Sequence, residues 1–115
     1  MARYSKTRAC PLAGRVVAIT GGARGIGQAT AAALVRRDAR VAIGDLDGAL
    51  ASRVAVELGA GAGGFALDVT DSAAFTGFLD AVEERRGPLD VLVYNIPPGT
   101  RRTLPRPERR NKHVY

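Results

Sequence analysis

Apolar and polar residues follow two different periods along the chain, and the period changes at glycines and prolines. Short apolar runs rich in β-branched residues predict strands over residues 15–20, 40–45, 65–69 and 89–93. Apolar residues at helical spacing predict helices over residues 26–38 and 48–59, and a third that Thr70 or Asp71 caps and Gly87 ends. Four glycines within residues 59–64 predict a flexible connector.

Strands that alternate with helices indicate βαβ units, a parallel sheet and right-handed crossovers. We therefore expect an α/β fold, half of a doubly wound Rossmann arrangement, with four parallel strands in the order 3-2-1-4 and three helices. Residues 13–95 should form this half-domain. Residues 1–12 should form a flexible arm, and residues 96–115 a basic tail, rich in proline and arginine, that we interpret as disordered.

Composition fits one small soluble domain and excludes several classes of protein. Hydrophobic residues make up 46% of the 115 residues and charged residues 24%. The sequence shows neither an apolar run long enough to cross a bilayer nor a signal-peptide pattern, and the lone Cys10 excludes an internal disulfide framework. The only histidine, His113, lies in the tail, so no catalytic triad or metal site is predicted. We expect a cytoplasmic protein with no membrane partner.

The net charge of +6 is concentrated at the two ends of the chain. Residues 13–93 hold eight arginines against ten acidic residues, whereas residues 1–12 carry +3 and residues 94–115 carry +5. Basic ends attract phosphates loosely. The few aromatic residues do not interleave with the basic ones, as stacking on bases would require. We interpret the ends as solvated arms and do not expect nucleic acid as a partner.

A glycine loop, residues 20–27, joins the first predicted strand to the first predicted helix. In such a loop a dinucleotide's pyrophosphate can approach the backbone and meet free N–H groups at the helix start. Gly21 would permit the tight turn, Gly25 the close approach, and Gly27 the packing of helix on strand. The loop therefore predicts a dinucleotide-binding site.

Asp45 ends the second predicted strand, where an acid would accept hydrogen bonds from the adenosine ribose and repel a 2′-phosphate. The alternative is a turn or N-cap residue, a role that Asp47 could equally have. Arg24 favours the opposite cofactor, because a basic residue in the loop could pair with a 2′-phosphate. On balance the sequence favours NAD over NADP.

Four segments in this order resemble motifs of the short-chain dehydrogenase/reductase family of oxidoreductases: TGGARGIG (20–27), VAIGDLD (41–47), LDVTD (67–71) and LDVLVYN (89–95). The resemblance runs from about Leu12 to Asn95. It implies that Asp45 selects NAD and that Asp68 and Val69 flank the adenine. The expected cofactor-binding residues are Thr20, Gly21, Arg24, Gly25, Ile26, Gly27, Asp45, Leu46, Asp68, Val69 and Asn95.

The sequence departs from that family after the fourth predicted strand. Asn95 matches the second asparagine of the family's Asn-Asn-Ala-Gly motif, but Tyr94 and Ile96-Pro97 replace the other positions. No tyrosine here is followed by a lysine four positions later, so the family's Tyr-x-x-x-Lys pair is absent, and its catalytic serine has no match. No catalytic residue is therefore predicted.

The resemblance and these departures together imply a truncated family member that binds NAD(P) at most, without turnover. Two alternatives stay open: a non-catalytic dinucleotide-binding or regulatory module, and a half-enzyme completed by another chain. The open edge of the fourth predicted strand is apolar, which favours self-association through that edge.

Overall fold

The computed structural model describes residues 12–95 and the two residues 113–114. Its strands are β1 (Val16–Thr20), β2 (Arg40–Asp45), β3 (Ala62–Ala66), β4 (Val91–Val93) and β5 (His113–Val114). Its helices are α2 (Gly25–Arg36), α3 (Gly48–Leu58) and α4 (Ser72–Arg86). Within the described residues, no helix is both long and apolar enough to cross a membrane.

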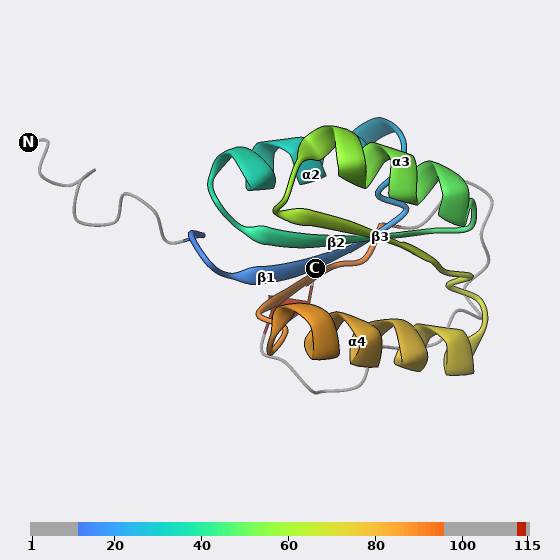
Figure 1. Ribbon diagram of the computed structural model, residues 1–115. Helices are drawn as coiled ribbons and strands as arrows, with labels where there is room; N and C mark the ends of the chain where they lie inside the picture. The colour runs from blue at the N-terminus through green and yellow to red at the C-terminus, as the bar shows by residue number, and fades with distance from the viewer. Residues whose placement is uncertain (1–11, 96–112, 115) are drawn as a thin grey trace, which may run out of the picture.

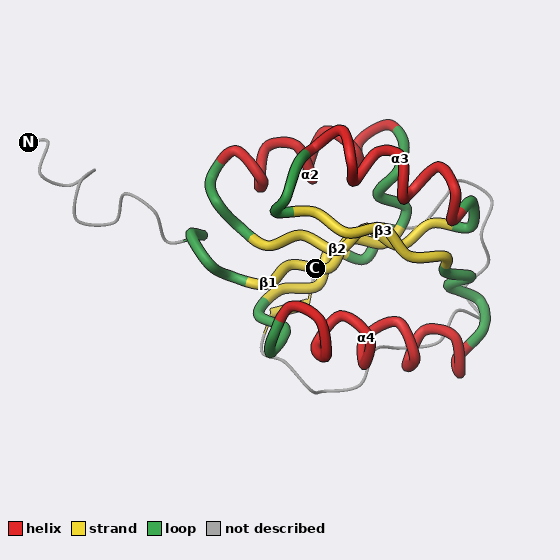
Figure 2. Tube along the Cα trace, viewed as in Figure 1, coloured by secondary structure: helices red, strands yellow, loops and turns green. Residues whose placement is uncertain are grey.

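The strands form a single parallel sheet in the order β3-β2-β1-β4-β5. Helices α2 and α3 cover one face of the sheet and α4 covers the other (Figures 1 and 2). This confirms the predicted order 3-2-1-4 and the doubly wound arrangement. Both faces are covered because the strand side chains are apolar in both directions, as a parallel sheet requires.

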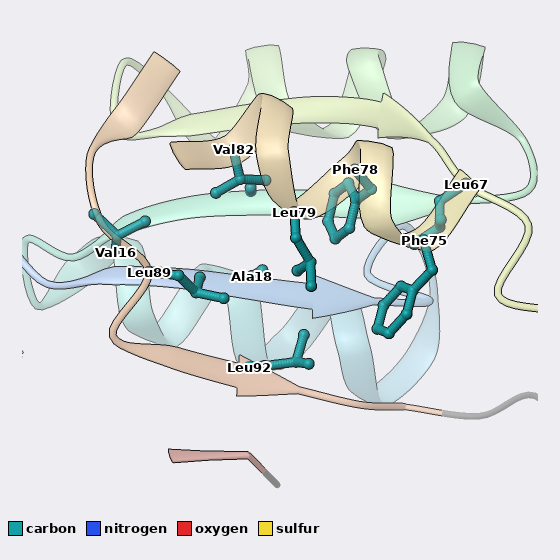
Figure 3. Packing of buried hydrophobic residues seen from close by; sticks show 10 residues of the cluster. Val16, Ala18, Leu67, Phe75, Phe78, Leu79, Val82, Leu89 and Leu92 are labelled. Atoms are coloured by element: carbon teal, nitrogen blue, oxygen red, sulfur yellow. The ribbon is translucent and has the colours of Figure 1, made fainter. Parts of the chain in front are cut away.

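Two apolar clusters hold the helices to the sheet. On the α4 face, the rings of Phe75 and Phe78 and the side chains of Leu79 and Val82 point toward the strands (Figure 3). There they meet residues of the sheet and its loops: Val16, Ala18, Leu67, Leu89 and Leu92. On the other face, α2 and α3 pack on a second cluster: Val17, Ile19, Val41 and Ile43. Burial on alternate faces fixes which way each strand side chain points.

The third strand was predicted at the wrong residues. β3 covers residues 62–66 and pairs with β2 from Val41↔Ala62 to Asp45↔Ala66, whereas the sequence pattern indicated 65–69. The supposed connector therefore contains most of the strand. Its glycines serve packing: a Cβ on Gly64 would overlap the carbonyl of Ala51 in α3, and one on Gly63 would overlap the Arg86 guanidinium.

The edge beyond β4 also differs from the prediction. His113 and Val114, within the predicted tail, form a short strand that pairs in parallel with Val91 and Leu92, a pairing that the sequence did not predict. The same pairing covers part of the edge that was expected to be open. The remaining tail, residues 96–112 and 115, and residues 1–11 of the predicted arm lie outside the described residues.

Candidate functional site

The carboxyl ends of the parallel strands meet at one edge of the sheet. Thr20 pairs with Gly44, Ile19 with Val93, and Asp45 with Ala66, so the loops that follow β1, β2, β3 and β4 emerge side by side. The chain winds in opposite directions from β1 to β2 and from β3 to β4, so β1 and β4 flank the switch point of the sheet. Open α/β sheets bind their ligands at this position.

The glycine loop is bound to β2 and closes tightly on the start of α2. The N–H groups of Gly21 and Gly22 donate to the carbonyl of Gly44, at 2.7 and 3.3 Å. Gly21 has a φ of +65°, which disfavours any residue with a Cβ. A Cβ on Gly27 would overlap the carbonyl oxygen of Gly21. The helix can therefore begin against the turn only because residue 27 is glycine.

The first turn of α2 has no side-chain cap. Arg24 occupies the N-cap position with an extended backbone, φ −147°, and its side chain accepts no hydrogen bond from the turn, which also lacks acidic residues. Gly25 has a φ of +53° and open space where a Cβ would lie, and Ile26 is 81% exposed. The positive end of this helix, with N–H groups that have no partner within the helix, therefore faces the carboxyl edge of the sheet.

Asp45 is buried beside the loop, with 8% of the residue exposed. Its Oδ2 accepts from the N–H of Ala23 at 3.3 Å, and its Oδ1 accepts from the N–H of Asp47 at 3.1 Å. The second bond is a turn interaction of the kind weighed from sequence. The N-cap role belongs to Asp47, whose carboxylate accepts from the N–H of Leu50 at 3.0 Å.

Arg24 lies between these two acids. Its Nη2 is 3.9 Å from Oδ1 of Asp45 and 3.9 Å from Oδ2 of Asp47. The residue that the sequence offered as a partner for a 2′-phosphate is thus paired with two carboxylates. At this corner of the site, two negative charges face one positive charge.

The loop after β3 places the residues expected to flank an adenine. Asp68 is exposed and accepts from the hydroxyl and the N–H of Thr70, at 2.6 and 3.0 Å. The Thr70 hydroxyl, and then its backbone N–H, hold the pKa of Asp68 below its usual value. Val69 packs at the border of the α4-face cluster, and Leu46, after β2, is 72% exposed.

Asn95 joins β4 to the glycine loop. Its backbone N–H donates to the hydroxyl of Thr20 at 2.8 Å, and that hydroxyl donates to the carbonyl of Asn95 at 2.9 Å. The Asn95 amide also donates to the carbonyl of Gly21 at 3.3 Å. Thr20 is fully buried, so this connection fixes the start of the glycine loop to the chain after β4. The sequence identified both residues but gave no sign of the bond between them.

Tyr94 stands at the position of the first asparagine in the family motif. Its ring stacks on Phe75 of α4, with centroids 5.4 Å apart and planes at 20°. Partial burial raises the pKa of its phenol above the usual value.

Comparison with known proteins finds similarity to short chain dehydrogenases. A family model described as short chain dehydrogenase matches residues 15–108, further along the chain than the resemblance first indicated. Sorbitol dehydrogenase of Cereibacter sphaeroides is 46% identical over 84 residues, which cover 73% of this chain and 33% of that protein. 2-(S)-hydroxypropyl-CoM dehydrogenase 3 of Xanthobacter autotrophicus is 47% identical over 87 residues, which cover 73% of this chain and 34% of that protein.

Solved structures agree with these relatives. The crystal structure of 3-ketoacyl-(acyl-carrier-protein) reductase from Brucella melitensis, complexed with NADH, matches with a TM-score of 0.69 at 36% identity. The match covers 71% of this chain and 34% of that one. The chain thus spans about a third of the length of the curated relatives it matches.

Proposed function

The chain belongs to the short-chain dehydrogenase family, and from that premise we propose that its half-domain binds NAD at the carboxyl edge of the sheet. The proposal rests first on the uncapped start of α2. A helix start without a side-chain acceptor is a ready site for an anionic group, and Gly25 leaves open space for a pyrophosphate beside the first-turn N–H groups.

The preference for NAD rests on charge. Asp45 and Asp47 lie beside the glycine loop, where we propose that the adenosine ribose binds, and Arg24 offsets only one of their two charges. A 2′-phosphate would meet a net negative corner, whereas ribose hydroxyls could donate to Asp45. We assign NADP a weaker affinity on this ground.

The remaining expected residues are proposed as follows. Asp68 and Val69 would flank the adenine, as their match to the family motif implies. Ile26 and Leu46 are exposed apolar side chains at the same edge, and a bound dinucleotide would cover them. Thr20 and Asn95 would act by holding the loop, because their hydrogen bonds are made to each other and to Gly21.

We further propose that this polypeptide binds the cofactor without turning a substrate over. Among these 115 residues no tyrosine is followed by a lysine four positions later. The second candidate is a half-enzyme completed by another chain; the match covers 33% and 34% of the two relatives named above.

Calorimetric titration of the full 115-residue chain with NAD, NADP and ADP-ribose tests the binding proposal. We expect saturable binding of NAD and ADP-ribose and weaker binding of NADP. The absence of heat with all three ligands, for a chain shown by circular dichroism to be folded, would contradict it. Nicotinamide reduction with a panel of alcohols, alone and after mixing with candidate partner chains, would separate simple binding from a completed half-enzyme.

A further inference from the structure

Asp47 makes two interactions with two different oxygens. Oδ1 accepts from the N–H of Leu50 at 3.0 Å and so caps α3, while Oδ2 is 3.9 Å from Nη2 of Arg24. The cap fixes the carboxylate at the start of the helix. The second oxygen is thereby held toward the glycine loop, and the position of this negative charge does not depend on the arginine.

Compared with Asp47, the Asp45 carboxylate is less available to hold the Arg24 guanidinium. Its carboxylate already accepts from two backbone N–H groups, and its side chain is 9% exposed, whereas that of Asp47 is 50% exposed. The Arg24 side chain is 64% exposed and comes from the loop itself. An exposed guanidinium at this position could turn toward a 2′-phosphate if its acidic partners did not hold it.

We propose that Asp47 is a specificity-determining residue: it draws the Arg24 guanidinium to the carboxylates and so denies it to a 2′-phosphate. Its own charge adds repulsion against that phosphate. This inference rests on the proposed binding of a dinucleotide at the loop. Asp47 would thus be a second determinant of cofactor choice beside Asp45.

The test removes the charge of Asp47 while keeping the cap. In Asp47→Ser the hydroxyl can still accept from the N–H of Leu50. Asp71→Ser is a matched control, because Asp71 caps α4 in the same way, accepting from the N–H of Ala74 at 3.1 Å. Dissociation constants for NAD and NADP are measured by calorimetry on the full chain and both variants, at low and high salt.

We expect Asp47→Ser to raise the affinity for NADP relative to NAD by about tenfold at low salt, and less at high salt, because exposed charges are screened. Asp71→Ser should leave the ratio within about twofold. Adding Arg24→Gln to Asp47→Ser should remove most of the gain, since the released guanidinium is then absent.

The possible outcomes separate the two proposals. If the folded wild-type chain binds neither cofactor, the proposed function fails. If it binds NAD but Asp47→Ser leaves the ratio unchanged, or Asp71→Ser shifts it equally, the role of Asp47 is overturned. Asp47→Asn, which also keeps a cap acceptor, replaces the serine variant if a thermal melt shows that the latter is unfolded.

Discussion

The three helices begin in two different ways. α3 and α4 each start with an aspartate, Asp47 or Asp71, whose carboxylate accepts from the N–H three residues on. α2 starts with Arg24, whose side chain makes no such bond, and a cation at the positive end of a helix is unfavourable. The difference shows where the chain gives up a local stabilising bond, and that place is the candidate site.

Packing stabilises the start of α2 instead. An N-cap contributes about 1 kcal/mol, and a glycine in a helix costs up to about 1 kcal/mol relative to alanine. α2 lacks the stabilisation of a side-chain N-cap and also has a glycine, Gly27, in its first turn. In return, Gly27 lies directly on the Gly21 carbonyl, and Ala23 donates to Asp45. The helix begins here because tertiary contacts hold it.

The largest effect is expected for Gly27→Ala. The new Cβ would overlap the Gly21 carbonyl, so loop and helix must separate, which costs about 2–3 kcal/mol of stability. Dinucleotide binding should fall below detection with it. Urea unfolding and calorimetry measure the two effects.

Gly77→Ala is the control for that substitution. Gly77 lies within α4, and a Cβ there meets nothing within 4 Å. The same chemical change should therefore stabilise the chain by about 0.5–1 kcal/mol and leave binding intact. Equal effects at the two glycines would show that the close approach at Gly27 carries no weight.

Asp71→Ala should cost about 1 kcal/mol of stability, because it removes the cap of α4. The affinity for NAD should stay within about twofold, since the carboxylate serves only the helix. Chemical denaturation gives the first quantity and calorimetry the second. A large loss of affinity would contradict the inference that the capped start of α4 serves stability and only the uncapped start of α2 serves binding.

Much of the fold could be predicted because a sheet that is covered on both faces has continuous apolar strands, which are visible in the sequence. β2 was predicted at its observed residues, and the ends of β1 and α3 differ by one residue. The error at β3 has a tertiary cause. Glycine is depleted in strands, and Gly64 is required by the close approach of the α3 backbone, which no local pattern reveals. β5 is two residues long and depends on the edge that it pairs with.

For the site, the sequence identified residue types and left their pairing open. The bonds between Thr20 and Asn95 span 75 positions and follow from the pairing of β1 with β4. The sequence offered Arg24 as a partner of a 2′-phosphate, and the structure pairs it with Asp45 and Asp47. Such pairings arise because the ends of neighbouring strands lie side by side, so they can be found only once the strand order of the sheet is known.

A smaller effect, with opposite signs for stability and binding, is expected when a cap is added to α2. The backbone of Arg24 is already extended, as an N-cap requires, so Arg24→Ser should stabilise the chain by about 0.5 kcal/mol. The hydroxyl would compete with a phosphate for a first-turn N–H, and a cation is lost, so NAD affinity should fall about threefold. Thermal melts and calorimetry measure both. Arg53→Ser, on an exposed position of α3, removes the same charge and should produce neither change.

The smallest effect concerns the turn before α4, where Asp68 accepts from Thr70. These bonds favour the carboxylate and lower the pKa of Asp68, so their contribution to stability is present above the acid's ordinary pKa and is lost as pH falls through the lowered value. Thr70→Val removes the hydroxyl, the larger cause, and keeps the backbone N–H. The pKa of Asp68, followed by the NMR shift of its carboxyl carbon, should rise toward the ordinary value, and acid unfolding should begin at slightly higher pH. An unchanged pKa would mean that the bond from the Thr70 N–H alone holds the carboxylate, and that the hydroxyl adds nothing to the turn before α4.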